Sequence, residues 1–567
     1  MSFVHNLWRS ADVFLVYAAR SVPLRTARGR ETHTVAPRFR AGGEGLHVLA
    51  RDAAGPWPWA VSETREIPVR HLRQAAVTAT ALLTLGGGVV AAAQAAPAAV
   101  PFPSIGWQQR NCDYDGNGFD DVLTGAPGAT VSGASGAGYV TVQYSSPGGL
   151  STTKKSVLHQ NVSGVPGGAE AGDGFGGAVA SGDLDNDGYD DAVVGIPGED
   201  LTGLSDAGGA VIFWGSPTGL HGSDSTWLEN DDPRAGAHFG RAVEAARYSA
   251  PDPADPNADP RDSLAVLEDD ALLFFTLAPG EETQRPTMSE RGIRATEFAP
   301  RSGGFEFRSL SHGNYNEDSW ADLAVSGVTT GQQPGAGTVH VLHGAPDIGA
   351  LGDGGTFPGG PAVVSGDWDG TGQDDLVIGD TGAGAPKGGG ITLYLGRGDL
   401  SGLEPEPAQY WTQDSPGVPG TAEAGDQWGA DLSAGDTDGD GHPDLAVGAP
   451  GEDIASVPDA GAVWVLRGDP TGFSGAGVKS FDQQLAAIPG AAEKSDRWGG
   501  QVRLIDADKD RLFGLLAAAP GENTDDGFMW VVPASSSGLV AQGTWTYDGA
   551  RLGAPTANAR FGAAIDE

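Results

Sequence analysis

The sequence predicts an all-β fold, a seven-bladed β-propeller of four-stranded antiparallel blades, on three observations. Glycine and proline number 90 and 38 among 567 residues, and both residues weaken helices and punctuate short strands. One unit of about 70 residues recurs along the chain, as in folds that are built from repeats. The chain also ends on the beginning of a further unit. Together these features favour a ring of small sheets.

The repeated unit has a constant order of parts. A segment such as FGGAVASGD precedes an acidic loop, an apolar run, a Gly-Pro turn and a second apolar segment, and residues 175–220 and 428–473 contain every part. Residues 238–248 and 262–267 mark a degenerate copy without the loop, and residues 249–262 indicate an extended surface excursion. The acidic loops of the other six units begin at Asp113, Asp183, Asn314, Asp367, Asp436 and Asp506.

Seven such units fill residues 96–567, the predicted propeller domain. A four-stranded sheet cannot cover both of its apolar faces, so the sheets must pack against one another, and a ring leaves only short edges exposed. An open solenoid is the alternative, but ARFGAAIDE at residues 559–567 begins an eighth unit that stops at once, as ring closure requires. Whether this segment or SIGWQQRNC starts the first blade stays open. In the second unit the predicted strands are residues 175–181, 191–196, 209–214 and 225–230.

The acidic loops follow the pattern D-x-D-x-D-G-x-x-D, which is complete from Asp183 to Asp191. Side chains at positions 1, 3 and 5 can turn toward one point, Gly at position 6 permits a sharp turn, and the ninth residue completes the shell. Oxygen ligands without His or Cys select Ca²⁺ over zinc or copper. A solvated acidic turn would use the same residue types, but repetition at one place in successive units favours metal binding.

Five loops are predicted to bind Ca²⁺, with about three to five ions in total. The loops are numbered by unit, so the third number is not used. The fourth loop, which begins at Asn314, has Ser319 in place of Gly, and the fifth loop, which begins at Asp367, has the hydroxyl of Thr371 at position 5. In the seventh unit, Arg511 replaces Gly and Gly514 takes position 9, so metal binding by Asp506–Asp510 stays open. The predicted ligands are Asp113, Asp115, Asn117, Asp121, Asp183, Asp185, Asp187, Asp191, Asn314, Asn316, Asp318, Asp322, Asp367, Asp369, Thr371, Asp375, Asp436, Asp438, Asp440 and Asp444.

A secretory signal peptide is predicted at residues 69–95, far from the first residue. A short basic stretch precedes an apolar run, and Ala93-Gln94-Ala95 provides a small-x-small cleavage pattern. A membrane anchor is the alternative, although the run is short and contains three consecutive glycines. Residues 1–68 lack sustained helical or strand periodicity, so we expect them to be absent from the mature protein, whose true start would lie near Val69.

The charge is unevenly distributed along the chain. The net charge is −40, yet residues 1–75 hold 11 Lys and Arg against 6 Asp and Glu, so the acidity lies in the repeats. Such a surface excludes nucleic acid as a partner, because phosphates require Lys and Arg, and it favours cations or basic partners. The single cysteine, Cys112, cannot form an internal disulfide, so calcium is the expected cross-link in an exported protein.

The motifs that flank the loops carry a resemblance to a known family. With FG at residues 175–176 and GAPG at residues 125–128 and 448–451, the sequence resembles the FG-GAP repeat family, the units of the integrin α-subunit N-terminal propeller. The resemblance implies a seven-bladed β-propeller with calcium in the hairpin loops of several blades, and adhesion or ligand binding outside cells. Trp428 and Trp498 depart from the motif, since they replace its Phe.

The expected function is therefore that of an adhesion or ligand-binding module, secreted or at the cell surface and without a stable membrane anchor. We expect a monomer whose partner is an unknown extracellular protein or glycan. The sequence contains no HExxH motif, G-x-S-x-G elbow or P-loop, so an enzyme is not expected. A lectin-like propeller is the first alternative, with Trp320 and Trp368 as candidates for exposed sugar-stacking residues, and a secreted hydrolase is the second.

Overall fold

The chain divides into two compact units, Met1–Ala93 and Gln94–Glu567, which are described separately. In the first unit, the computed structural model describes an antiparallel hairpin of β1 (Arg38–Gly42) and β2 (Gly45–Leu49). The predicted signal peptide, residues 69–95, lies outside the described residues, and the absence of residues 1–68 from the mature protein stays a prediction. In the second unit the described residues are 112–250, 261–276, 287–294, 305–329, 337–382, 385–397 and 401–566.

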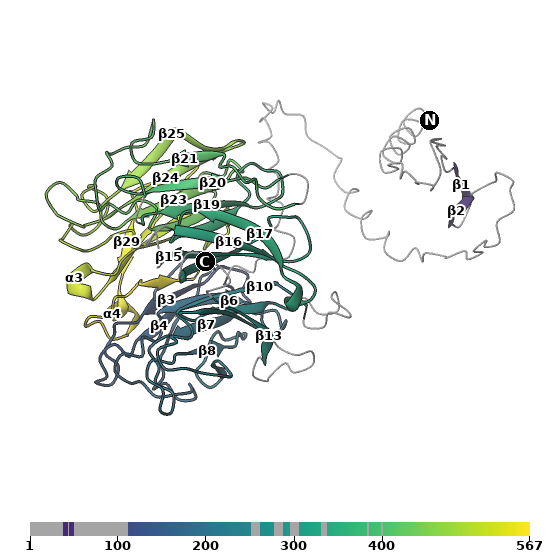
Figure 1. The fold of residues 1–567 in the computed structure, drawn as a ribbon. Coiled ribbons are helices and arrows are strands. Elements are labelled where there is room, and N and C mark those ends of the chain that lie inside the picture. The colour runs from purple at the N-terminus through teal and green to yellow at the C-terminus, as the bar shows by residue number, and fades with distance from the viewer. Residues whose placement is uncertain are drawn as a thin grey trace, which may run out of the picture. The chain divides into compact units, whose positions relative to one another are not determined.

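The described part of the second unit forms seven four-stranded antiparallel sheets, which confirms the predicted β-propeller (Figure 1). Strands follow one another in chain order within blades 2 to 7. Blade 2 contains β6 (Ala178–Gly182), β7 (Asp191–Ile196), β8 (Gly209–Phe213) and β9 (Ser225–Leu228). Blade 3 contains β10 (Ala242–Ala246), β11 (Ser263–Leu267), β12 (Ala271–Thr276) and β13 (Thr287–Arg294). Blade 4 contains β14 (Phe305–Gly313), β15 (Asp322–Thr329), β16 (Gly337–His343) and β17 (Gly352–Pro358).

The remaining blades have the same plan. Blade 5 contains β18 (Val363–Gly366), β19 (Asp375–Asp380), β20 (Gly390–Tyr394) and β21 (Gln409–Trp411). Blade 6 contains β22 (Asp431–Gly435), β23 (Asp444–Ala449), β24 (Ala462–Asp469) and β25 (Gly472–Phe481). Blade 7 contains β26 (Gln501–Ile505), β27 (Gly514–Ala519), β28 (Phe528–Val532) and β29 (Trp545–Tyr547). Short helical turns occur at η1 (Ile348–Ala350), α3 (Glu522–Asp525) and α4 (Gly549–Leu552).

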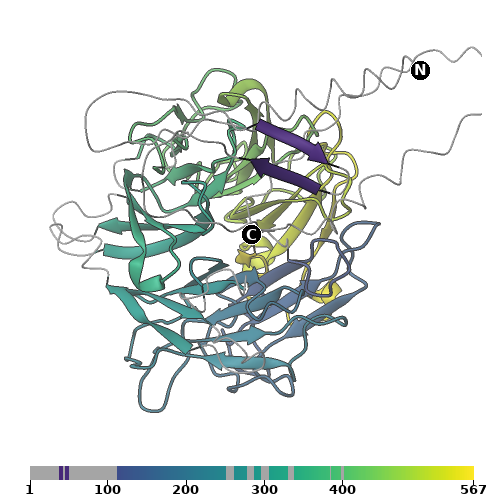
Figure 2. The ribbon, with the colours of Figure 1, turned by 90° about the vertical axis from the view of Figure 1, so that its right-hand side faces the viewer.

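Blade 1 joins the two ends of the described propeller. Its order is β30 (Ala564–Ile565), β3 (Val122–Ala126), β4 (Tyr139–Gln143) and β5 (Lys155–Leu158). The first strands β6, β10, β14, β18, β22, β26 and β30 contact one another in that order, and β30 also contacts β6, so the ring closes (Figure 2). The segment at the end of the chain therefore starts the first blade, which resolves the alternative that the sequence left open.

A buried charge pair fixes this closing strand. Asp566, directly after β30, accepts hydrogen bonds from the Tyr114 hydroxyl (2.6 Å) and the Leu123 backbone N–H (3.0 Å) of blade 1. Its carboxylate also lies 2.6 Å from Nη1 of Arg503, in β26 of blade 7. Both side chains are almost completely buried. The last strand is thus held by groups from both blades that it joins.

The apolar core lies between neighbouring blades, and the FG motif lines it. Phe175 is fully buried among side chains of blades 1 and 2, including Val140 and Phe213. Gly176, with φ of +84°, approaches the Tyr139 carbonyl so closely that a Cβ would lie 2.8 Å from its oxygen. The equivalent aromatic residues of later blades make the same backbone bridges and are equally buried, and they are Phe239, Trp428 and Trp498. Trp therefore fills the Phe position without changing its role.

Candidate metal centres in the acidic loops

The acidic loops lie at one end of the blades because each enters the second strand of its sheet. The loop of blade 2, for example, runs from Asp183 to Asp191 between β6 and β7. In blade 1, β30 is the first strand and β3 the second, and the loop directly precedes β3. The Gly-Pro turns follow the second strands and so lie at the opposite end. Within the described residues, no helix has the length and hydrophobicity needed to cross a membrane.

The acidic residues themselves fold each loop. In blade 1, Asp113 accepts hydrogen bonds from the backbone N–H groups of Asn117 (2.9 Å) and Gly118 (2.7 Å). The ninth residue joins the loop to the sheet, since Asp121 accepts from Tyr114 N (3.2 Å) and from Ser145 N beyond β4 (2.8 Å). Asp191, Asp322, Asp375 and Asp444 make the corresponding pair of bonds in their blades.

A left-handed residue at position 4 is shared by all six loops, and the sequence pattern did not predict it. The residues are Gly116, Asn186, Glu317, Gly370, Gly439 and Lys509, with φ of 66°, 61°, 52°, 70°, 76° and 57°. Position 6 is also left-handed where Gly was predicted, at Gly118, Gly188, Gly372 and Gly441. Arg511 adopts this conformation as well, with φ of 72°, so a side chain at position 6 does not prevent the loop from forming.

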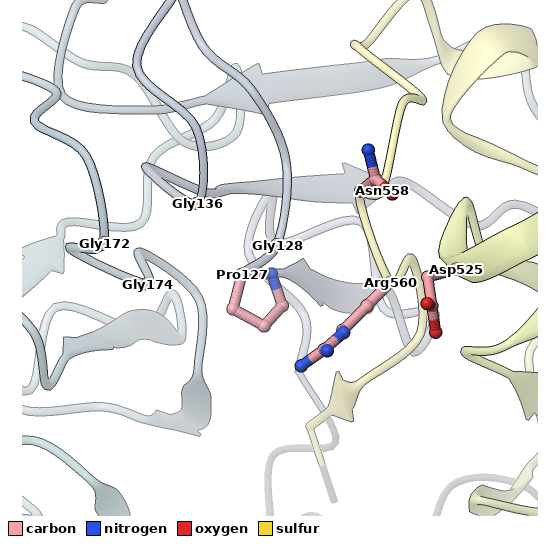
Figure 3. Close-up of a pocket in the computed structure, with 8 residues that line it drawn as sticks. All are labelled: Pro127, Gly128, Gly136, Gly172, Gly174, Asp525, Asn558 and Arg560. Atoms are coloured by element: carbon pink, nitrogen blue, oxygen red, sulfur yellow. The ribbon is translucent and has the colours of Figure 1, made fainter.

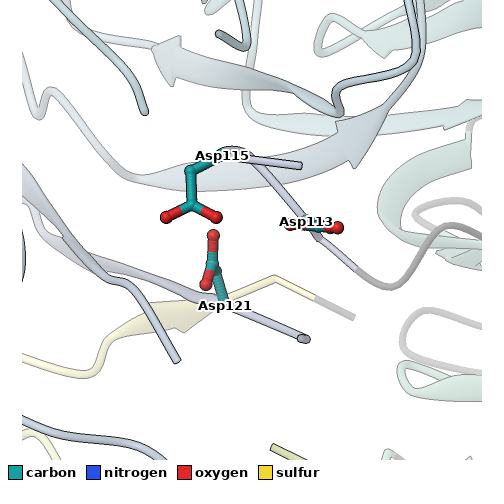
Figure 4. A group of neighbouring side chains, drawn as sticks. All are labelled: Asp113, Asp115 and Asp121. Carbon is teal, nitrogen blue, oxygen red and sulfur yellow. The ribbon is translucent and has the colours of Figure 1, made fainter. Parts of the chain in front are cut away.

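In five loops, three carboxylates each place one oxygen within 4.8 Å of the other two. This spacing suits a shared ion, because Ca²⁺–oxygen distances of about 2.3–2.6 Å allow ligand oxygens up to roughly 5 Å apart. Figure 4 shows the group of blade 1, in which the carboxylates of Asp115 and Asp121 face each other. The groups are Asp113–Asp115–Asp121, Asp183–Asp185–Asp191, Asp367–Asp369–Asp375, Asp436–Asp438–Asp440 and Asp506–Asp508–Asp510.

Position 5 joins these groups less often than the sequence predicts. Asn117 and Asp187 each use a side-chain oxygen to accept from the backbone N–H two residues later, at 2.9 Å in both cases. Asp187 is outside the group of its loop. In the fifth loop the backbone N–H of Thr371 donates to Asp367 and Asp369, both at 3.0 Å. The predicted ligand role of Thr371 stays a prediction.

The fourth loop forms no such group among the described residues, because two of its four predicted ligands are amides. Nδ2 of Asn314 donates to the Asp318 carbonyl (3.1 Å), and Nδ2 of Asn316 donates to the Asp318 carboxylate (3.0 Å). Oδ1 of Asn314 is buried and has no hydrogen-bond partner. The seventh loop, by contrast, brings Asp506, Asp508 and Asp510 together, although the sequence left its metal binding open.

Burial makes these carboxylates costly to keep ionised. Burial first, and the neighbouring charges of Asp115 and Asp369 in addition, raise the pKa of Asp121 and of Asp375 to about 8. Burial, with the charge of Asp187, likewise raises the pKa of Asp185 to about 6. A bound cation would reverse this effect, since it stabilises the charged form.

The loops differ in the basic side chains beside them. Lys154 Nζ contacts the carboxylate of Asp115, but the lysine side chain is 54% exposed. Nδ1 of His343 lies 3.0 Å from Oδ2 of Asp322, and the proximity of this carboxylate raises the pKa of His343. In the sixth loop, Arg467 contacts Asp438, Asp440 and Asp444. Within the described residues, no ion pair involves the three carboxylates of the fifth loop, which are Asp367, Asp369 and Asp375.

Comparison with known families identifies the repeat. Residues 110–142, 175–213 and 428–466 match the family model of the FG-GAP repeat, and each match includes an acidic loop. The chain carries FG-GAP repeats. The resemblance predicted from the FG and GAPG motifs is therefore confirmed, and residues 175–213 contain the FG of Phe175 and Gly176.

Curated relatives of this FG-GAP chain are named phosphatidylinositol-glycan-specific phospholipase D. The mouse protein is 27% identical over 237 residues, which cover 41% of this chain and 25% of the relative. The bovine protein is 25% identical over 438 residues, which cover 75% of this chain and 44% of the relative. The chain thus spans less than half the length of either relative.

Two solved structures match the chain at low sequence identity and low structural similarity. A structure of BBS1N in complex with ARL6DN has 12% identity and a TM-score of 0.36, and the match covers 67% of this chain and 86% of that one. A Bacillus licheniformis rhamnogalacturonan lyase has 10% identity and a TM-score of 0.29, with 51% and 59% coverage.

A second set of carboxylates, buried or half-buried, lies at the opposite end of blades 2, 6 and 7, where the sequence predicted no site. Each is a Glu that accepts a hydrogen bond from a Gln placed 39 residues earlier. Burial raises the pKa of Glu199, Glu452 and Glu522 to about 7. The pairs are Gln160–Glu199 (2.7 Å), Gln413–Glu452 (2.7 Å) and Gln483–Glu522 (2.9 Å). Their equal spacing in three units is a signal that repeat alignment could have found.

A hollow of about 420 Å³ lies at this same end, between parts of blades 1, 2 and 7 (Figure 3). Half of its lining residues are glycines, and Figure 3 shows Asp525 and Arg560 on the side away from Gly172 and Gly174. These two side chains have opposite charges, so the lining does not select one ligand chemistry. The lining residues are Pro127, Gly128, Gly136, Gly172, Gly174, Asp525, Asn558 and Arg560.

The expectation that Trp320 and Trp368 are exposed is wrong. Trp320 is 6% exposed and lies beneath the guanidinium of Arg247, whereas Trp368 is fully buried and packs edge-on against Phe473. Both residues lie within acidic loops, yet their side chains are buried. Among the described residues, the exposed large hydrophobic side chains are Tyr410 and Leu485.

Proposed function

We propose that this protein is a secreted, calcium-binding FG-GAP propeller that acts as an adhesion or ligand-binding module. The observation that carries the proposal is the fifth acidic loop. Its three carboxylates converge, Asp375 is fully buried, and no ion pair in the described part of the chain neutralises them. Like charges at such spacing repel by about 1 kcal/mol per pair even at the dielectric constant of water, so the arrangement favours a bound cation.

The donor set supports calcium as this cation. The loops offer carboxylate, amide and hydroxyl oxygens, the ligands of Ca²⁺, and their fit extends to the first, second and seventh loops. Asp367, Asp369 and Asp375 would hold an ion in blade 5, and about three to five ions would bind to the whole chain. When bound, calcium would neutralise the loop and link two strands of the blade. Extracellular calcium modules have dissociation constants of about 10⁻⁴–10⁻³ M, which suits binding outside cells.

Equilibrium dialysis of the purified chain against calcium tests this step directly. We expect at least three ions per chain, a higher melting temperature with calcium than with EDTA, and little rescue by magnesium, which demands near-octahedral geometry. A chain that takes up no calcium, or whose melting temperature is the same in EDTA, would refute the metal proposal.

Secretion is supported by the predicted signal peptide at residues 69–95 and by the need for millimolar calcium. Mass spectrometry of the exported protein should find a first residue close to Ala96. Recovery of an exported chain that begins at Met1 would contradict the proposed processing.

The proposed partner is an extracellular protein or a glycan, and the chain is proposed to act as a monomer. The net charge of −40 supports a basic partner or one that is bridged by calcium. Adhesion of labelled protein to cells or to extracellular matrix should be abolished by EDTA and restored by calcium. Adhesion that persists in EDTA would separate partner binding from the metal sites.

We propose a binding role in preference to catalysis. The relatives are named for phospholipase activity, but the chain covers less than half of their length, so that activity is an alternative to be assayed. Incubation with a phosphatidylinositol-glycan-anchored protein should release no product, and release would favour the hydrolase. The lectin alternative depended on Trp320 and Trp368, whose burial removes its support, and a glycan array would restore it if a sugar bound.

A further inference from the structure

Arg467 occupies a position in the sixth loop that is neutral in the fifth. It lies in β24, one residue beyond Leu466, which pairs with Leu445 directly after Asp444. The same position in blade 5 is Leu395, because Tyr394 pairs with Leu376 directly after Asp375. The backbone N–H of the next residue donates to the ninth-position carboxylate in both blades, at 2.9 Å from Gly468 and 2.8 Å from Gly396. The two residues are therefore exact structural equivalents.

The guanidinium of Arg467 lies among the predicted calcium ligands. Its Nη2 contacts Oδ2 of Asp438 and lies 3.6 Å from Oδ2 of Asp440. Its Nη1 lies 3.0 Å from Oδ2 of Asp444 and 3.3 Å from the hydroxyl of Thr437. The side chain is only 14% exposed. The turn at Gly538 of blade 7 covers it so closely that a Cβ there would lie 2.9 Å from Nη1.

This contact changes which carboxylates converge. In the fifth loop the ninth-position Asp375 belongs to the three-carboxylate group with Asp367 and Asp369. In the sixth loop the group contains Asp440 instead, and Asp444 is outside it. Arg467 lies between Asp444 and Asp438, so the ninth position is paired with the guanidinium and not with the other carboxylates.

A guanidinium and a calcium ion cannot share this place. Arg remains protonated at all relevant pH values and only donates hydrogen bonds, so it offers no lone pair to a metal. Ca²⁺ needs about six to eight oxygen ligands, and the oxygens of Asp438 and Asp444 that face the loop are already used by N–H donors. The sixth loop matches the calcium pattern fully in sequence, but its residues thus do not fit the ion in this structure.

We propose that Arg467 is a built-in counter-cation that replaces calcium in the sixth loop, so that this loop stays folded without metal. The contrast with the other loops rests on the proposed calcium binding, whereas the role of Arg467 does not. Blade 6 would then be a metal-independent part of a propeller whose first, second, fifth and seventh loops respond to calcium.

A reciprocal exchange tests the proposal. Arg467→Leu gives the sixth loop the neutral residue of the fifth, and Leu395→Arg gives the fifth loop the cation of the sixth. Calcium stoichiometry of the full chain is measured by equilibrium dialysis, with melting temperature in calcium and in EDTA. We expect Arg467→Leu to gain one ion over the unmodified chain and to become more sensitive to EDTA, and Leu395→Arg to lose one ion.

An unchanged stoichiometry in Arg467→Leu would overturn the proposal, as would calcium bound to the sixth loop of the unmodified chain. If the unmodified chain binds no calcium, the general function fails, but a gain of one ion in Arg467→Leu would still support the role of Arg467. Hydrogen exchange of the unmodified chain covers the case in which neither variant folds. EDTA should speed exchange in residues 367–375 and leave residues 436–444 unchanged, and equal acceleration in both loops would overturn the proposal.

Discussion

The two ends of the blades hold carboxylates in different ways. At the acidic-loop end, several carboxylates of one loop converge, as Asp367, Asp369 and Asp375 do. At the opposite end, each Glu is paired with a Gln amide, as in Gln483–Glu522. Burial raises carboxyl pKa values at both ends, but a single group can be neutralised by a proton, whereas three converging groups favour a cation. We therefore expect the carboxylates of one end to respond to metal and those of the other end to respond to pH.

Calcium removal should have the largest effect on the free energy of unfolding, and it should act on the acidic-loop end alone. Each site held at ten times its dissociation constant contributes about 1.4 kcal/mol, so loss of three sites should lower the free energy of unfolding by about 4 kcal/mol. Urea unfolding in calcium and in EDTA measures this difference. The Glu522→Gln variant serves as a control and should lose the same amount, and a smaller loss in that variant would show that the two ends are coupled.

Asp375→Asn should remove the metal response of one loop. We expect a cost of about 2 kcal/mol in calcium, because a buried ligand is lost, and a smaller cost in EDTA, where repulsion from Asp369 is also lost. Melting temperatures in the two buffers provide the measurement. Asp440→Asn, which removes a member of the three-carboxylate group of the sixth loop, is the control and should show no such buffer dependence, so identical behaviour of the two variants would contradict the assignment.

The pH dependence of Glu522 tests the opposite end of the blades. Burial, together with the charge of Asp496, raises its pKa from 4.5 to about 7. Because the folded-state pKa is the higher one, the stability that Glu522 contributes is complete below pH 4.5 and is lost as the pH rises through 7. The difference in stability between the unmodified chain and Glu522→Gln should therefore shift by about 1.5 kcal/mol between these limits, after allowance for solvent screening.

Urea unfolding across this pH range, in constant calcium, measures the shift. Glu406→Gln, at an exposed position, is the control and should follow the unmodified chain. A Glu522→Gln profile parallel to that of the unmodified chain would mean that this Glu does not titrate between pH 4.5 and 7.

Lys154→Met should have the smallest effect, because the lysine is more than half exposed. Loss of its contact with Asp115 should tighten calcium binding to the first loop about twofold, equivalent to ~0.5 kcal/mol. Calcium titration followed by calorimetry provides the measurement, with Lys155→Met as the control, since that lysine contacts the Arg551 carbonyl. Weaker calcium binding in Lys154→Met would show that the lysine supports the loop and does not compete with the ion.

The sequence predicted the features that are encoded locally. The FG and GAPG motifs identified the repeat, and the acidic pattern identified the loops that enter β7 and β23, because each depends on residues close together in the chain. The incomplete unit at residues 559–567 indicated closure of the ring, since β30 repeats the start of every other blade.

The sequence could not predict contacts that depend on strand register. Arg467 meets Asp444 only because β24 pairs with β23 in one particular register, and the sequence analysis therefore treated the sixth loop as equivalent to the second. The burial of Trp368 depends on Phe473 of the next blade, which no local pattern specifies. Arg511 departs from the Gly expected at position 6. It nevertheless adopts the left-handed conformation, and its backbone N–H donates to the carboxylate of Asp506.

The closing strand β30 also has a consequence for biosynthesis. Residues 564–566 belong to the same blade as residues 122–126, so during synthesis blade 1 cannot be completed until residue 566 has been added. Until then β3 presents an unpaired edge, which is the kind of surface that pairs wrongly with other chains. Arg503 and Tyr114, which bind Asp566, would then hold the closed ring, because only a chain translated as far as residue 566 can bury that carboxylate.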